Sequence, residues 1–246
     1  SGFVELSGDN NCNTREATDS LKLIGRTAKA TAKTYAISSV AIASLILFLL
    51  YTQEIKNFGN ATLFNLESFK ILIGLFIGGA IPCLFSSFAL TSVNKTGGKV
   101  VEKARRQFRE IKGLISGKTK PEYGKCVDVV AKASLKEMIL PAMFSVIIPI
   151  VIGFVLGTQA LGGFLIGSII TGFFITTSIA TREVAWDNAK KYIKKGGVNK
   201  KNSFVHQTAA TGDTVGNPYK GAVEMAINPM IMVFNIVSLL IVGFLV

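Results

Sequence analysis

The sequence contains 246 residues, of which 49% are hydrophobic and 17% are charged. The apolar residues form long blocks, which excludes an ordinary soluble domain, because a helix needs about 20 apolar residues to cross a bilayer. The formal net charge is +12, and we expect this excess to lie in the cytoplasmic loops of a membrane protein and not on a nucleic-acid-binding surface. Cys12, Cys83 and Cys126 lie far apart and His206 is the single histidine, so neither a disulfide framework nor a histidine-based metal site is indicated.

Five apolar stretches are each long enough to span a membrane, and none contains a charged residue except near an end. The bilayer core offers no water to backbone groups, so each stretch is expected to be a helix. The predicted fold class is an all-α integral membrane protein with five transmembrane helices and basic cytoplasmic loops. The stretches are Thr34–Gln53, Phe69–Leu90, Met138–Leu156, Gly162–Ala180 and Met225–Val246.

Basic residues concentrate in the loops that follow the second and fourth spans. The loop Glu54–Ser68 has one lysine, and the loop around Gly157 has no charge. This alternation places the N-terminus and the basic loops in the cytoplasm and the C-terminus on the opposite side. The basic residues are Lys95, Lys99, Lys103, Arg105, Arg106, Arg109, Lys112, Lys118, Lys120, Lys125, Lys132 and Lys136, and then Lys190, Lys191, Lys194, Lys195, Lys200, Lys201 and Lys220.

Six segments follow from this topology. They are a cytoplasmic N-terminal segment (1–33), a transmembrane helix pair (34–90), a basic cytoplasmic loop (91–137), a second transmembrane pair (138–182), a cytoplasmic extension and loop (183–224) and the last transmembrane helix (225–246). Within the basic loop, Lys99–Ile115 carries an apolar stripe at helical spacing, which predicts an amphipathic helix that packs on neighbouring helices or lies on the membrane surface. Glycines four residues apart in the fourth span, Gly163 and Gly167 among them, predict close helix contact.

The first candidate site lies where the fourth span leaves the membrane. Asp187, Lys190, Lys191 and Lys194 fall on one face of a continued helix. A carboxylate beside several ammonium groups suits a magnesium-bound polyphosphate, because Mg²⁺ prefers hard oxygen ligands and lysines bind phosphate oxygens. A basic helix end that satisfies the helix dipole has the same pattern, so both interpretations stay open.

The second candidate site immediately precedes the last span. Thr211–Lys220 contains two glycines, Asp213 and a proline, and this composition predicts a turn. Such a turn brings Asp213 and Lys220 to the membrane surface on the same side as Asp187.

Separate stretches, in order over nearly the whole chain, resemble the C-terminal part of membrane-bound, ion-translocating inorganic pyrophosphatases. They are Arg105–Ile111, Lys120–Tyr123, Cys126–Asp128, Ala133–Pro141, Ala160–Gly163, Ala185–Ile193 and Gly212–Gly216. The resemblance implies an all-helical protein, usually a homodimer, that hydrolyses magnesium pyrophosphate at the cytoplasmic face and moves protons or sodium across the membrane. This chain, which opens at Ser1 without a methionine, would supply the last five spans.

The resemblance also implies roles for individual residues. Lys190, Lys191 and Lys220 match lysines that bind pyrophosphate, and Asp187 and Asp213 match ligands of Mg²⁺. A further position, Lys33, matches a lysine of the ion gate. Lys29 falls where potassium-independent members carry a lysine, which implies a pump without a potassium requirement.

The sequence departs from the family pattern at several acidic positions. Asn217 and Gly221 stand where the family has aspartates, and Lys22–Ala28 carries two cations where the family has an acid and an amide. Residues 181–184 replace a small-residue stretch. Because Mg²⁺ is held by anionic oxygens, these changes weaken the metal site, and this chain alone is expected to be inactive.

Three functions remain open from the sequence. The first is the C-terminal part of a pyrophosphatase with a partly degenerate site, completed by the remaining N-terminal spans or a partner chain. The second is a non-catalytic pyrophosphatase-like membrane subunit or scaffold, favoured by the lost carboxylates. The third is an unrelated carrier or scaffold whose basic loops bind acidic lipid headgroups. Pyrophosphate, membrane lipid and a second copy are the expected partners, and nucleic acid is not.

Overall fold

A computed structural model of the chain describes residues 12–58, 67–114, 119, 121–194, 204–218 and 223–245. Every regular element in these ranges is a helix, and five helices are long and apolar enough to cross a membrane, which confirms the predicted all-α fold with five spans. The helices are α2 (Cys12–Asn57), α3 (Phe69–Glu110), α4 (Tyr123–Leu156), α5 (Thr158–Lys194), α6 (Phe204–Pro218) and α7 (Glu224–Leu245).

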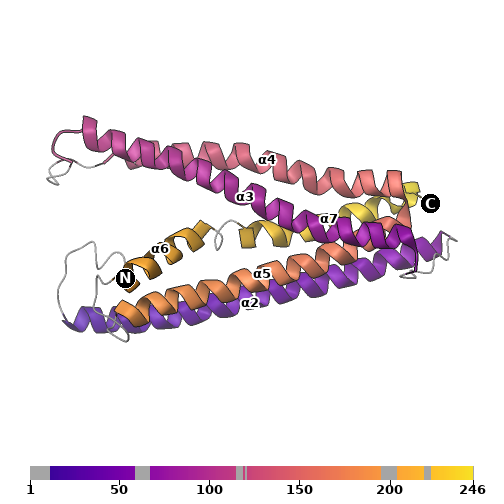
Figure 1. The fold of residues 1–246 in the computed structure, drawn as a ribbon, viewed down its shortest axis with the longest axis horizontal. Coiled ribbons are helices and arrows are strands. Elements are labelled where there is room, and N and C mark those ends of the chain that lie inside the picture. Colours follow the sequence, from indigo (N-terminus) through magenta and orange to yellow (C-terminus); the bar gives the residue numbers. More distant parts are fainter. Residues whose placement is uncertain are drawn as a thin grey trace.

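The helices run lengthwise in one elongated bundle (Figure 1). In that view α3 and α4 form the upper side, α2 and α5 form the lower side, and α7 lies between them. The most extensive pairing is between α3 and α5, and α7 contacts α2, α4 and α5. The shorter α6 packs on α5 at the end of the bundle opposite the C-terminus.

The pairing of α3 with α5 depends on glycines from both helices. A Cβ atom added at any of four glycines would collide with the backbone of the facing helix, so larger residues are excluded at this distance. The pairs are Gly74 with Ala160, Gly78 with Phe164, Gly163 with Ile71 and Gly167 with Leu75. The helix contact predicted from the glycines of the fourth span is therefore present, and α3 contributes matching glycines.

The central helix α7 carries much of the buried core. Ile227 and Phe234 are fully buried, and the Phe234 ring lies 5.0 Å from the Phe164 ring of α5, centroid to centroid. At the C-terminal end of the bundle, α4 and α5 are joined through Gly157 alone, whose φ of 86° favours glycine. The buried Tyr51 of α2 fixes this turn by donating a hydrogen bond of 2.9 Å to the carbonyl oxygen of Thr158.

The helices extend beyond the apolar stretches. The amphipathic segment expected over Lys99–Ile115 is the continuation of α3, which ends at Glu110 before Gly113 adopts a φ of 88°. Two members of its apolar stripe, Val101 and Phe108, stay about half exposed. Gln107 contacts the N-cap of α4: its Nε2 donates to the Glu122 carbonyl (3.0 Å) and its Oε1 accepts from the Glu122 N–H (3.1 Å).

Candidate functional site

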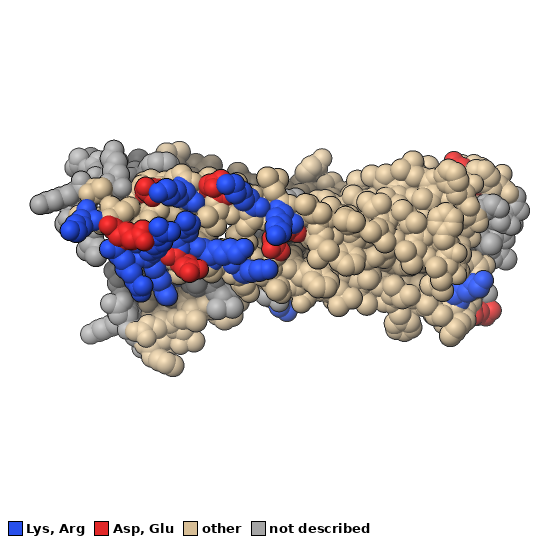
Figure 2. Space-filling view, turned by 90° about the horizontal axis from the view of Figure 1, so that it is seen from above, with Lys and Arg blue, Asp and Glu red and all other residues tan. Residues whose placement is uncertain are grey.

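Charged side chains gather at one end of the bundle, over the C-terminal part of α3 and the N-terminal part of α4 (Figure 2). Among the described side chains, three exposed ion pairs lie here: Arg106–Glu110 at 2.7 Å, Lys125–Glu122 at 2.7 Å and Lys132–Asp128 at 2.8 Å. Exposed pairs of this kind contribute little stability. The other Lys and Arg side chains here leave an excess of positive charge at this end. The helix α6 and the C-terminal end of α5 lie at the same end of the bundle.

The first candidate segment lies on α5, which continues without a break to Lys194, as the sequence predicted. Asp187, Lys190 and Lys191 therefore all lie on one helix. Lys190 is partly buried. The side chains of Asp187, Lys191 and Lys194 lie outside the described part of the structure.

The turn predicted over Thr211–Lys220 is wrong, because α6 runs from Phe204 through Gly212 to Pro218. Two glycines weaken a helix by about 1 kcal/mol each relative to alanine, but packing on α5 compensates, since a helix takes most of its stability from tertiary contacts. Lys220 and Gly221 lie outside the described residues, as do the side chains of Asp213 and Asn217.

The contact between α5 and α6 is made by Trp186 and Gly212. A Cβ atom at Gly212 would lie 2.6 Å from Cζ3 of the Trp186 ring and 3.0 Å from its Cε3, so the indole lies directly on the glycine. Asp187 follows the tryptophan and Asp213 follows the glycine. The two candidate segments therefore meet at the charged end of the bundle. Their aspartates lie 26 residues apart in the sequence.

The remaining predicted residues, Lys29 and Lys33, lie on α2. Lys29 is exposed and Lys33 is partly buried. Lys33 precedes Ile37 by one helical turn, and Ile37 is 7% exposed and packed inside the bundle. Lys22 and Arg26 lie on the same helix, with side chains outside the described set.

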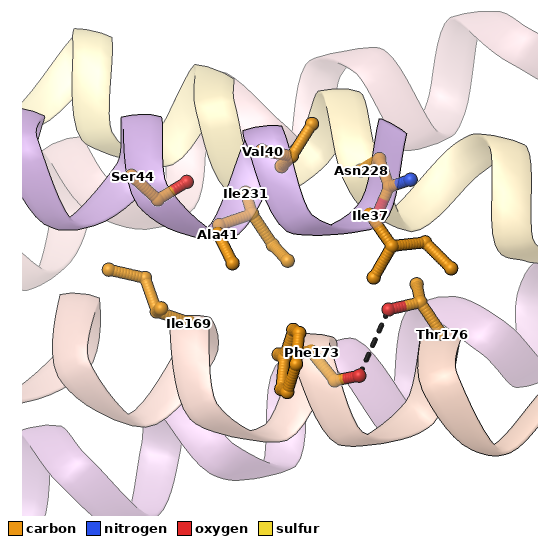
Figure 3. Close-up of a pocket in the computed structure, with 9 residues that line it drawn as sticks. All are labelled: Ile37, Val40, Ala41, Ser44, Ile169, Phe173, Thr176, Asn228 and Ile231. Carbon is orange, nitrogen blue, oxygen red and sulfur yellow. Dashed lines mark hydrogen bonds between the residues drawn. The ribbon is translucent and has the colours of Figure 1, made fainter. Parts of the chain in front are cut away.

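A small cavity lies between α2, α5 and α7, next to Ile37 (Figure 3). Its volume of about 10 Å³ is close to the space that one water molecule occupies. Ser44, Thr176 and Asn228 bring polar groups to its wall, and the Thr176 hydroxyl lies 2.9 Å from the Gly172 carbonyl oxygen and 3.0 Å from that of Phe173. Sequence reasoning missed these residues, although polar side chains inside apolar spans are the signal that marks them.

Two more polar residues of α7 lie deeper in the bundle. Asn235 and Ser238 are fully buried, and their atoms Oδ1 and Oγ have no hydrogen-bond partner among the described residues. The Asn235 amide donates to the Ile231 carbonyl at 2.9 Å, so its oxygen is left as a free acceptor. An unpaired buried acceptor costs about 1–3 kcal/mol. Asn228, Asn235 and Ser238 recur at helical spacing along α7, and we call these three residues, with Ser44 and Thr176, the polar seam.

No group of three or more His, Cys, Asp or Glu side chains able to hold a metal ion occurs within the described part of the chain. The two acids proposed as Mg²⁺ ligands, Asp187 and Asp213, fall outside the side chains surveyed. Their oxygens are of the type that Mg²⁺ prefers, and the packing of Trp186 on Gly212 brings their helices together. The chemistry of the donor set and the helix arrangement therefore fit a magnesium-bound anion.

Comparison with known proteins gives consistent matches. The family model described as "Inorganic H+ pyrophosphatase" matches residues 1–241. The chain is 43% identical over 226 residues to the K(+)-insensitive pyrophosphate-energized proton pump of Methanosarcina mazei, covering 92% of this chain and 33% of that protein. It is 40% identical over 252 residues to the protein of the same name from Chloroflexus aurantiacus, covering 98% and 32%. A relative from Clostridium tetani, provisionally named a K(+)-stimulated pyrophosphate-energized sodium pump, is 40% identical over 92% of the chain and 33% of its own length. The chain thus spans about a third of the length of these relatives.

Proposed function

Because the chain belongs to the inorganic H+ pyrophosphatase family, we propose that it forms the C-terminal part of a membrane pump that couples hydrolysis of magnesium pyrophosphate to ion translocation. The contact of Trp186 with Gly212 is the single observation that supports this proposal most. It joins the segments of Asp187 and Asp213 at the basic end of the bundle, where an anionic substrate and its metal would be attracted.

In this proposal the lysines hold the substrate and the aspartates hold its metal. Lys190, Lys191 and Lys220 bind phosphate oxygens, while Asp187 and Asp213 ligate Mg²⁺. The bound Mg²⁺ supplies electrophilic polarisation of the phosphoryl oxygens. The rest of the site comes from spans outside this chain, and for that reason the chain alone does not hydrolyse pyrophosphate.

The polar seam offers the ion a route through this part of the bundle. Three of its residues, Ser44, Thr176 and Asn228, line the cavity between α2, α5 and α7, and α5 continues directly from Thr176 to the substrate segment at Asp187. Lys33 lies one turn from the cavity wall, which supports its assignment to the ion gate. Lys29 on the same helix acts in place of a potassium ion. A pump of this family works as a homodimer in our proposal, with its basic end in the cytoplasm.

A non-catalytic membrane subunit is the second candidate function. The sequence observation that favours it is the replacement of acids by Asn217 and Gly221 beside the proposed Mg²⁺ site. Fewer carboxylates bind Mg²⁺ more weakly. In this case the fold and the polar seam persist, but the protein neither binds nor hydrolyses magnesium pyrophosphate.

The decisive experiment uses the complete membrane protein that contains this chain, reconstituted in lipid vesicles. Phosphate release and ion uptake are measured with magnesium pyrophosphate. Asp187→Ala and Lys191→Ala are each expected to abolish both activities. The matched controls are Asp128→Ala and Lys132→Ala, which break an exposed pair with the same four-residue spacing at the same end.

The controls are expected to keep their activity, because an exposed ion pair contributes at most about 1 kcal/mol. Unchanged turnover in both site variants would show that the assigned residues are wrong. A wild-type protein that neither binds nor hydrolyses magnesium pyrophosphate would instead establish the non-catalytic subunit.

A further inference from the structure

A groove on the bundle surface between α3 and α4 is separate from the substrate segments and the polar seam. Its volume is about 90 Å³, and apolar side chains of both helices line it. Phe85 forms the floor at 8% exposure, while Leu84, Phe88 and Leu140 stand half exposed at the rim. The Phe88 and Phe144 rings stack across the two helices with centroids 6.1 Å apart and planes 8° apart.

The end of the groove that faces the charged part of the bundle closes with a polar contact. Ser92 of α3 donates a hydrogen bond of 3.0 Å to the Glu137 carboxylate of α4. Beyond this contact Lys95 and Lys136 are exposed, and neither has an acidic partner among the side chains the structure describes. Lys95 follows Phe88 by seven residues on the same helix face, and Lys136 precedes Leu140 by four.

The distances of these lysines from the apolar rim, measured along the helices, can be compared with the layers of a bilayer. At 1.5 Å per residue, Lys136 lies about 6 Å and Lys95 about 10 Å beyond the apolar rim. The headgroup region on each side of the hydrocarbon core is about 5–8 Å thick. The apolar slot at hydrocarbon depth therefore ends below Lys136 at headgroup depth, and Lys95 starts just beyond that layer, where its flexible four-carbon stem lets the ammonium group reach back to a phosphate.

We propose that the groove between α3 and α4 binds one acyl chain of an anionic phospholipid, whose phosphate is held by Lys95 and Lys136. The groove has a volume of only about 90 Å³, which is too small for a further helix, since a helix with its side chains is about 10–12 Å wide. A single hydrocarbon chain is narrow enough to enter it. The stacked phenylalanines offer a flat wall to methylene groups, and because lipid tails are as apolar as the groove, packing contacts and not the hydrophobic effect favour the chain there. Figure 2 shows the concentration of Lys and Arg on this face, which selects a negatively charged headgroup.

The test is native mass spectrometry of the purified, delipidated protein in a mild detergent. Phosphatidylglycerol and phosphatidylcholine with matched chains are added in turn, and retained lipids are counted per protein. The wild type is expected to retain one phosphatidylglycerol in preference to phosphatidylcholine. The double variant Lys95→Gln/Lys136→Gln is expected to weaken phosphatidylglycerol binding about tenfold.

Two further variants separate the headgroup from the chain. Lys56→Gln/Lys70→Gln removes the same charge at the opposite end of the bundle and is expected to leave the retained lipid unchanged. Leu140→Trp fills the groove and is expected to release both lipids, with folding checked by circular dichroism.

Three outcomes would overturn the proposal. The first is equal retention of the two lipids by the wild type. The second is equal loss of phosphatidylglycerol in both lysine double variants, which would indicate non-specific charge attraction. The third is full displacement of phosphatidylglycerol by millimolar inorganic phosphate, which would indicate an anion site without a lipid. None of these results depends on pyrophosphate hydrolysis, so the lipid site and the pump are tested independently.

Discussion

The contact of Trp186 with Gly212 gives the candidate site its most direct test, because Trp186 is the single tryptophan of the chain. Gly212→Val places a branched side chain where the indole lies, and the half-exposed ring is expected to turn toward water. In the complete protein, with any tryptophan outside this chain replaced by phenylalanine, the emission should shift to longer wavelength and pyrophosphate hydrolysis should fall.

Gly124→Val is the matched control for this change. Nothing lies within 4 Å of a Cβ at Gly124, near the start of α4. It is expected to leave both emission and hydrolysis unaltered. An unchanged emission maximum in Gly212→Val would contradict the packing of α6 on α5.

A second test at the scale of single residues concerns Asn235. Its Oδ1 is buried without a partner among the described residues, so Asn235→Leu removes an unsatisfied acceptor. Unfolding free energy is expected to stay the same or rise by about 1–3 kcal/mol. Ion uptake per pyrophosphate hydrolysed is expected to fall, because the polar seam loses an oxygen.

Thermal unfolding and the ratio of uptake to phosphate release measure these two effects. Ile236→Leu, on the exposed side of the same helix, serves as the control and should change neither quantity. An unchanged ratio of ion uptake to phosphate release in Asn235→Leu would show that this residue does not contribute to the ion route.

At the scale of helices, the close contact between the glycines of α3 and α5 predicts that a glycine-to-alanine change lowers stability at the contact but not elsewhere on α3. Gly78→Ala and Gly163→Ala place a methyl group against backbone atoms, which cannot rotate away. Each is expected to destabilise the protein by about 1–3 kcal/mol or more, as overpacking does. A lower unfolding temperature in detergent is the measurement.

Gly97→Ala on the same helix α3 is the control, because nothing lies within 4 Å of its added methyl group. It should be neutral or slightly stabilising, since alanine is the better helix former. Similar unfolding temperatures for all three variants would mean that α3 and α5 do not approach as closely as their glycines indicate.

The number of spans could be predicted from the sequence, but the full lengths of the helices could be predicted only in part. Hydropathy predicted the five spans because bilayer thickness fixes an apolar length. Helical spacing of side chains beyond the apolar blocks predicted that α5 continues to Lys194, but hydropathy could not show that the segment after Lys99 is part of the same unbroken helix as the second span, because hydropathy marks the membrane and not the helix end. The helix α6 was missed for a different reason: glycine and proline indicate a turn in isolation, and the packing of Gly212 on Trp186 overrides that preference.

At the scale of the whole molecule, the ordered sequence motifs led to the family, but the sequence could not show how the candidate residues meet. The segments of Asp187 and Asp213 are far apart in the sequence, so their meeting depends on the pairing of α5 with α6. The polar seam was hidden for a similar reason. Ser44, Thr176 and Asn228 are each visible in the sequence as polar residues inside or beside apolar spans, but only the packing of three helices brings them around one cavity.

The distribution of charge over the whole bundle predicts its orientation in the membrane. Cationic loops are retained on the cytoplasmic side during insertion, so the end that carries Tyr123 should be cytoplasmic and the end that carries Phe58 should face the other compartment. Both side chains are more than half exposed. Single cysteines at these positions, in a protein whose native cysteines are replaced by serine, can be labelled with a membrane-impermeant maleimide.

Tyr123→Cys is expected to react in inside-out vesicles and Phe58→Cys in right-side-out vesicles. The two positions lie at opposite ends of the bundle, so each serves as the control for the other. The reverse labelling would place Asp187 and Asp213 away from the cytoplasm, because α5 ends and α6 lies at the same end as Tyr123. A site so placed could not draw pyrophosphate from the cytoplasm, and the proposed direction of the pump would be wrong even if the lysine and aspartate assignments were correct.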